Sequence, residues 1–212
     1  MNKLLAYLGI LACVSTVAVA SELVEGTDYV RIQVPRSTES PSKIEVVEFF
    51  YYACPHCKDF NPTLTKWVTK LPKDVVFKRI PVSFKRAALV NHAKLYYALE
   101  ITGDLKRLDN EVFAALHDQK INLADEAILM DWISKKGVDR QKFGDAYKSF
   151  GVDSKVSRGQ QIADAYGING VPALTIDGRY RMTGNNIKGH EELLAQTNQM
   201  IKQARAENGK KK

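Results

Sequence analysis

The sequence predicts an α/β fold in which a central mixed sheet is flanked by helices and interrupted by an all-helical insertion. Three patterns predict it: strand, helix and strand over residues 44–82, only helices over residues 85–151, and a β-hairpin and helix before the C-terminus. The 212 residues, 45% of them hydrophobic, suffice for such a core. We therefore expect a discontinuous sheet domain over residues 21–84 and 152–212, and a helical insertion domain over residues 85–151.

Residues 1–20 have the pattern of a cleavable secretory signal peptide. Lys3 supplies an early positive charge, residues 4–19 are largely apolar, and Ala18-Val19-Ala20 is a small-residue cleavage site. The apolar run is shorter than the roughly 20 residues that a membrane-spanning helix needs. We expect cleavage after Ala20 and a mature protein in an oxidising compartment. Alternatively, the protein is a lipoprotein anchored through Cys13, although the apolar run before this cysteine is short for that.

The formal charge of +7 does not indicate a nucleic-acid-binding protein. Part of it lies in Lys3 and in the tail Lys210–Lys212, and the other basic residues are interspersed with acidic ones. No basic stripe alternates with aromatic residues. We expect an ordinary solvated surface and no nucleic-acid partner.

The first half of the sheet follows from apolar runs. Strands are expected over residues 28–32, 44–52 and 75–82, with a polar loop over 35–41. The second run is nearly continuous, which is typical of a central strand buried on both faces. Because a helix connects the second strand to the third, we expect these two to pair in parallel. The helix continues over residues 58–71, and Pro62 predicts a kink near Lys58.

The rest of the chain is helical in pattern until a turn near the C-terminus. Helices are expected over residues 89–102, 105–117, 124–135, 140–150 and 153–166, with Gly151 among the separating residues. Asp177-Gly178, within residues 170–180, is typical of a hairpin turn, and residues 191–206 form a closing helix. We expect His92 and His117 at the surface or its boundary, without a ligand role.

The motif Cys54-Pro55-His56-Cys57 lies where the apolar strand meets the start of a helix. Pro55 suits the first helical position, which makes Cys54 the N-cap. The free N–H groups and the helix dipole there, together with a charge on His56, favour a Cys54 thiolate and lower its pKa below about 8.5. Cys54 is then the exposed, reactive sulfur, and Cys57 is the buried resolving thiol. A stabilised thiolate makes the disulfide more oxidising, so the motif indicates thiol–disulfide exchange in the oxidising direction.

Two other interpretations of the cysteines are weaker. A zinc site needs about four clustered ligands, but once the signal peptide is removed only Cys54 and Cys57 remain, and His92, His117 and His190 stand apart. We therefore expect no metal. A purely structural disulfide is disfavoured because a bridge at a helix start is strained and exposed.

Glu48 interrupts the buried strand. With a period of two, its side chain points the same way as Phe50 and Tyr52, toward the Cys54 turn. A buried carboxylate is costly unless it is paired or protonated. It can form an ion pair with Arg79 or Lys78, or it can accept a proton from Cys57 during exchange. The two roles are compatible.

These residues resemble the DsbA family of periplasmic thiol:disulfide oxidases within the thioredoxin superfamily. The resemblance rests on Glu48-Phe49-Phe50 before Cys54-Pro55-His56-Cys57, and on Gly170-Val171-Pro172-Ala173 before the hairpin, and it covers the mature chain. It implies a thioredoxin-like fold and a monomer that donates its Cys54–Cys57 disulfide, its only redox group, to newly exported proteins with cysteines. It also implies a periplasmic location and re-oxidation by a membrane partner of the DsbB type.

The resemblance further implies roles for single residues. Val171–Pro172 is expected to be a cis peptide, and the Gly170-Val171-Pro172 loop is expected to bind an extended substrate segment. Arg79 occupies the position of the family's basic partner of the buried acid. One departure is Asn61, where some relatives carry an acid, which leaves Glu48 as the candidate proton relay.

Two alternatives stay open at this point. The chain can be a binding module or chaperone whose cysteines are structural, or a reductase that runs the same exchange in the opposite direction.

Overall fold

The computed structural model describes residues 22–40, 42–185 and 187–209. In this part of the chain, five strands form one mixed sheet in the order β1-β5-β4-β2-β3. The strands are β1 (Tyr29–Arg31), β2 (Ile44–Phe50), β3 (Val75–Pro81), β4 (Ala173–Ile176) and β5 (Tyr180–Met182). The expected signal peptide lies outside the described residues. No described helix is both long and apolar enough to cross a membrane.

Strand β2 is an interior strand of the sheet, with a neighbour on each side, as its apolar sequence predicted. All seven of its residues are buried. It pairs in parallel with β3, where Glu48 faces Arg79, and antiparallel with β4, where Glu48 faces Leu174. Between β4 and β5 the chain turns at Asp177 and Gly178, both with positive φ, which confirms the predicted hairpin.

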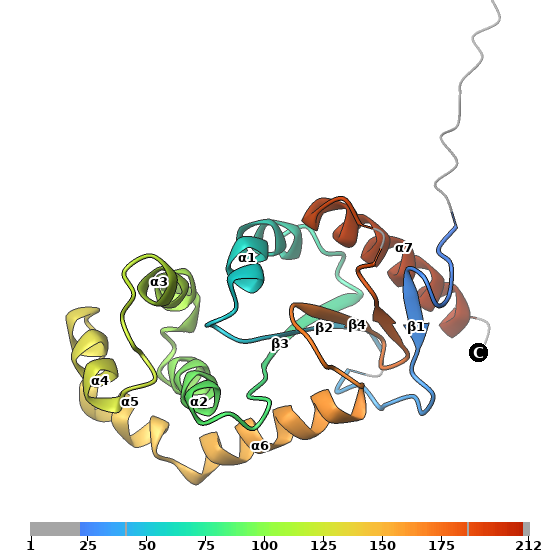
Figure 1. The fold of residues 1–212 in the computed structure, drawn as a ribbon. Helices are drawn as coiled ribbons and strands as arrows, with labels where there is room; N and C mark the ends of the chain where they lie inside the picture. The colour runs from blue at the N-terminus through green and yellow to red at the C-terminus, as the bar shows by residue number, and fades with distance from the viewer. Residues whose placement is uncertain (1–21, 41, 186, 210–212) are drawn as a thin grey trace, which may run out of the picture.

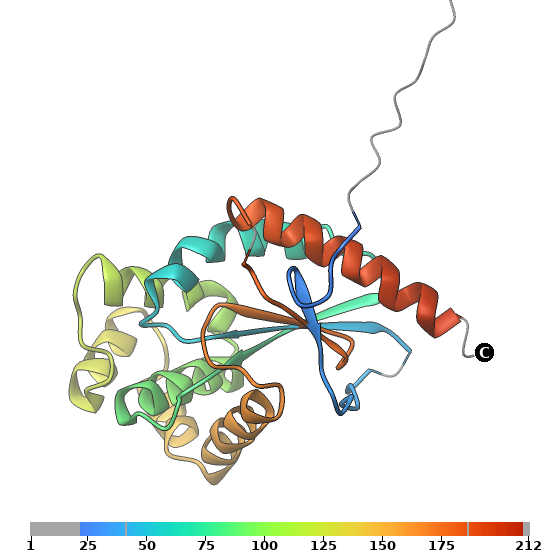
Figure 2. The same cartoon turned by 45° about the vertical axis from the view of Figure 1, so that its right-hand side comes forward.

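Helices cover both faces of the sheet (Figures 1 and 2). On one face lie α1 (Pro55–Val68) and α7 (His190–Gly209), and on the other lies α6 (Phe150–Ala165). Helices α2 (Ala87–Thr102), α3 (Leu105–His117), α4 (Glu126–Lys135) and α5 (Arg140–Tyr147) gather beyond one end of the sheet. This arrangement confirms the thioredoxin-like α/β fold with a helical insertion.

One expected helix boundary is wrong. We expected a break at Gly151, but the chain breaks at Lys148 and Ser149, and α6 begins at Phe150. The hydroxyl of Ser149 caps the new helix by accepting a hydrogen bond from the backbone N–H of Val152 at 3.2 Å. The expected division between residues 151 and 152 therefore falls inside the first turn of α6. The division into domains itself stays a prediction.

Candidate active site

The two cysteines lie at the first turn of α1, directly after strand β2. Cys54 is the N-cap, with an extended backbone (φ −83°, ψ 118°), and Pro55 begins the helix. The Cys54 sulfur accepts a hydrogen bond from the backbone N–H of Cys57, with an N···S distance of 3.4 Å. The expected position of Cys54 at the helix start is confirmed, and its sulfur faces N–H groups that have no partner within the helix.

Cys54 is more enclosed than we expected. We predicted an exposed sulfur, but Cys54 is only 3% exposed and Cys57 is fully buried. The reason is the loop Gly170-Val171-Pro172, which comes from the other end of the chain. The Cys54 sulfur lies 3.6 Å from the carbonyl oxygen of Val171, to which it donates a hydrogen bond when it is protonated, and the Val171–Pro172 peptide is cis. The loop thus covers the sulfur and brings a backbone carbonyl to it.

The pKa of the Cys54 thiol is lowered from its ordinary 9.0 to about 6. The largest cause is a hydrogen bond from the Cys57 thiol. Burial opposes it, and the backbone N–H groups of Cys57 and His56 and then the charge of His56 lower the pKa further. Burial, the same hydrogen bond and the charge of Cys54 raise the pKa of Cys57. At neutral pH the pair is therefore a Cys54 thiolate and a Cys57 thiol. Sequence reasoning missed the contribution of the Cys57 thiol.

Glu48 is a fully buried carboxylate in an ion pair with Arg79. Their Oε2 and Nε atoms are 2.5 Å apart. Of the two partners considered, the structure selects Arg79, because Lys78 is paired with Glu39 and Glu45. Among the described residues, the second oxygen of Glu48, Oε1, has no hydrogen-bond partner. Burial raises the pKa of Glu48 even though the charge of Arg79 opposes this. The role of Glu48 in proton transfer stays a prediction.

Asp109 in α3 completes a partly buried network that sequence reasoning missed. Its Oδ2 lies 2.8 Å from Nη1 of Arg79, so one guanidinium is shared between Asp109 and Glu48. Tyr52 donates its hydroxyl to Oδ1 at 2.8 Å, and Asn61 donates its amide to Oδ2 at 3.3 Å. The sequence does contain one indication of this network: Asp109 is an acidic residue beside the apolar stripe of an amphipathic helix. The network joins α3 of the insertion to β2 and to the edge strand β3.

One histidine does not lie where we expected. His92 is only 4% exposed, so the expectation of a surface or boundary position is wrong. Helices α3, α5 and α6 pack around α2 and leave it little free surface. Burial lowers the pKa of His92 to about 4, and the neutral ring packs in the core. His117 is half-buried, with Nε2 2.8 Å from the carbonyl oxygen of Tyr52.

The site is suited to sulfur chemistry. In the described ranges, no group of three His, Cys, Asp or Glu side chains is arranged to hold a metal ion. One sulfur is a thiolate at neutral pH, the second lies one helical turn away and holds its proton, and a carbonyl of an extended loop lies beside the first. The fold and this site define a thioredoxin-fold protein that exchanges a dithiol for a disulfide.

Comparison with known proteins gives the family. The model of the DSBA-like thioredoxin domain matches residues 45–194, and the chain belongs to this family. It is 37% identical over 189 residues to the thiol:disulfide interchange protein DsbA of Pseudomonas aeruginosa, covering 89% of each chain. It is 36% identical to that of Burkholderia cepacia, covering 92% of each. A crystal structure of Pseudomonas aeruginosa DsbA superposes with a TM-score of 0.82 over 87% of this chain and 95% of that one. The chain is accordingly a thiol:disulfide oxidoreductase.

Proposed function

We propose that the chain is a dithiol oxidase, which donates the Cys54–Cys57 disulfide to cysteine pairs of newly exported, still unfolded proteins. The observation that carries this direction is the environment of Cys54 in the reduced state. Its sulfur accepts a hydrogen bond from the backbone N–H of Cys57 at 3.4 Å, and the Cys57 thiol and the backbone of His56 also lower the pKa of Cys54. Each of these interactions stabilises the thiolate and hence the reduced form. A stabilised reduced form makes the disulfide a stronger oxidant.

The exchange proceeds in two displacements. A substrate thiolate attacks Sγ of Cys54, the S–S bond breaks, and Cys57 leaves as a thiolate. A second substrate thiolate attacks the substrate sulfur of the mixed disulfide, and Cys54 leaves as a thiolate. The substrate gives up two electrons, and the Cys54/Cys57 pair holds them. Cys57, with its raised pKa, takes up a proton, and we assign Glu48 to carry it because its charge acts on that thiol.

The loop at Val171 positions the substrate in this mechanism. The carbonyl oxygen of Val171 is 3.6 Å from the Cys54 sulfur, and Val171 is half-buried. An extended substrate segment can pair with this backbone and place its own cysteine beside Cys54, a form of strand addition. His56, exposed next to the sulfur, tunes the thiolate through its charge.

The same proposal gives the chain a location and partners. Residues 1–20 direct export and are removed, and the protein works in the periplasm as a monomer. Anchoring through Cys13 is the alternative. A membrane protein of the DsbB type re-oxidises the dithiol, and the disulfide is the only redox group needed.

Equilibration with glutathione redox buffers tests the direction. An oxidase should have a reduction potential at or above roughly −180 mV, and should oxidise a reduced, unfolded ribonuclease. Cys54→Ser should abolish this oxidation, while Lys66→Glu, an exposed change on the outside of α1, should leave it intact. A potential near −270 mV would instead indicate a reductase. Full activity of a Cys54→Ser, Cys57→Ser variant in preventing aggregation would indicate a chaperone.

A further inference from the structure

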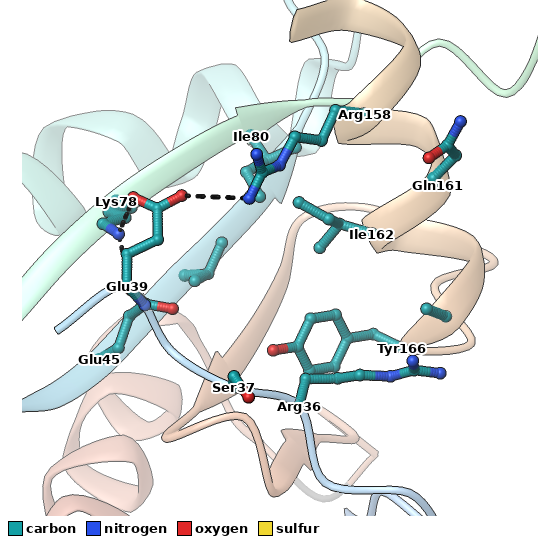
Figure 3. A pocket seen from close by; sticks show the side chains of 12 residues that line it. Arg36, Ser37, Glu39, Glu45, Lys78, Ile80, Arg158, Gln161, Ile162 and Tyr166 are labelled. Atoms are coloured by element: carbon teal, nitrogen blue, oxygen red, sulfur yellow. Dashed lines mark hydrogen bonds and ion pairs between the residues drawn. The ribbon is translucent and has the colours of Figure 1, made fainter. Parts of the chain in front are cut away.

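A cavity of about 350 Å³ lies on the α6 side of the sheet, and none of its lining residues belongs to the active site (Figure 3). We call it the α6 cavity. Its floor is apolar and is made by Val47 of β2, Ile80 of β3, and Ile162, Ala165 and Tyr166 at the end of α6. The volume is at the lower end of the roughly 300–1,000 Å³ that is typical of small-molecule sites.

The charges around the α6 cavity leave a positive excess. Lys78 is held by two carboxylates, with Nζ 2.5 Å from Glu39 and 2.7 Å from Glu45. Arg158 approaches Glu39 only at 3.9 Å, and its side chain is 72% exposed. Among the side chains drawn in Figure 3, none forms an ion pair or hydrogen bond with Arg36. The two guanidinium groups lie on different sides of the opening and are available to an anion.

The loop that forms the wall of the α6 cavity is fixed at both ends. The backbone N–H of Arg36 donates to the carbonyl of Gly178 at 2.9 Å. A Cβ at Gly178 would lie 2.1 Å from the Arg36 oxygen, so this approach requires glycine. At the other end the N–H of Glu39 donates to Oε2 of Glu45 at 3.3 Å. The wall therefore stands in place without a ligand, which lowers the entropic cost of binding one.

We propose that the α6 cavity binds a small amphipathic carboxylate with an unbranched apolar chain. The apolar floor accepts the chain, because taking apolar surface out of water is favourable. The carboxylate is held by Arg36, because a guanidinium presents paired N–H donors that match a carboxylate. Arg158, on the other side of the opening, adds a positive charge that attracts the anion over a longer distance. Neither cysteine takes part, so the site is independent of the proposed function.

Titration of sodium octanoate into the ¹⁵N-labelled oxidised protein tests the proposal. We expect saturable shifts of the amide signals of Val47, Ile162 and Tyr166, with a Kd of about 1 mM or below. Octylammonium has the same chain and the opposite charge, and it should bind at least about tenfold more weakly. The double variant Arg36→Glu, Arg158→Glu should weaken octanoate binding by at least about tenfold, and Lys66→Glu on the opposite face should not.

Two further measurements keep the test decisive. Retained thiol–disulfide exchange shows that the double variant is folded, and Ala165→Phe, which fills the cavity, provides a second loss of octanoate binding that does not change the charge. The proposal is overturned if octanoate causes no saturable shift, if octylammonium binds equally well, or if neither variant weakens binding. It is also overturned if the shifts gather around Tyr51 and Val171, the apolar surface beside the cysteines.

Discussion

Raising the pH from 5 to 9 should stabilise the reduced protein relative to the oxidised protein. The thiol of Cys54 has a folded pKa of about 6 and an ordinary value of 9.0. A group whose folded pKa is depressed contributes stability that is complete above its unfolded pKa and is lost as the pH falls through its folded pKa. The gain therefore develops between pH 6 and 9. The raised pKa of Cys57 acts in the opposite direction only above pH 9.

The magnitude follows from the two pKa values. At pH 7 about 91% of Cys54 is thiolate in the folded protein and about 1% in the unfolded chain, which adds about 1.4 kcal/mol to the free energy of unfolding. Above pH 9 the contribution approaches about 4 kcal/mol, since one pKa unit corresponds to about 1.4 kcal/mol. For a two-electron couple, about 1.4 kcal/mol makes the disulfide more oxidising by about 30 mV at pH 7.

Urea unfolding at each pH gives the free energy of unfolding of the reduced and of the oxidised protein. Subtracting the value for the oxidised protein removes the contribution of groups that titrate alike in the two forms. The difference between the forms should rise by about 1.4 kcal/mol per pH unit in the middle of the window. Cys54→Ala, measured as the reduced protein, should lose this rise. A difference that is flat from pH 6 to 9, or that falls, would refute the account of the thiolate.

Three further predictions concern single side chains. Asp109→Asn should lower the free energy of unfolding by about 1–3 kcal/mol, because it removes a half-buried charge that pairs with Arg79. Glu111→Gln in the same helix affects only an exposed ion pair and should cost under about 1 kcal/mol. Equal losses for the two variants in urea unfolding would contradict this. His56→Leu should raise the pKa of Cys54, measured by pH titration of the thiolate absorbance at 240 nm, by less than Cys57→Ala does. The reason is that the charge of His56 is the smallest of the causes that shift this pKa, and the reverse order would contradict this explanation. Gly178→Ala should lower the melting temperature more than Gly103→Ala does. Both glycines have positive φ, but only at Gly178 would the added Cβ clash with a backbone oxygen, that of Arg36. Equal melting temperatures for the two variants would disprove this contact.

Local patterns predicted most of the fold. The continuous apolar run of β2, the helix start at Pro55 and the Asp177-Gly178 turn are each decided by a few neighbouring residues, and all three are found as expected. The boundary at Ser149 was mistaken because a glycine pattern was preferred over a hydroxyl cap.

Contacts between distant segments were harder to predict. Asp109 joins Arg79 across 30 residues, and no local period shows that the two meet. His92 is buried because three helices surround α2, which depends on tertiary packing and not on the sequence of α2 alone. The enclosure of Cys54 by Val171 spans 117 residues. Pairing across such separations needs the fold itself.

The enclosure of Cys54 also affects the stage of its own folding at which a substrate chain can react with Cys54. Cys54 is only 3% exposed and its sulfur lies beside the Val171 carbonyl, so we expect a flexible, extended strand to reach it more readily than a cysteine already fixed in a folded surface. Under the proposed function, a client chain is therefore cross-linked early, while it is still emerging and before its own core forms. Cysteines that come first in the client would then meet the enzyme first, so the order of bridges would follow the order of translocation.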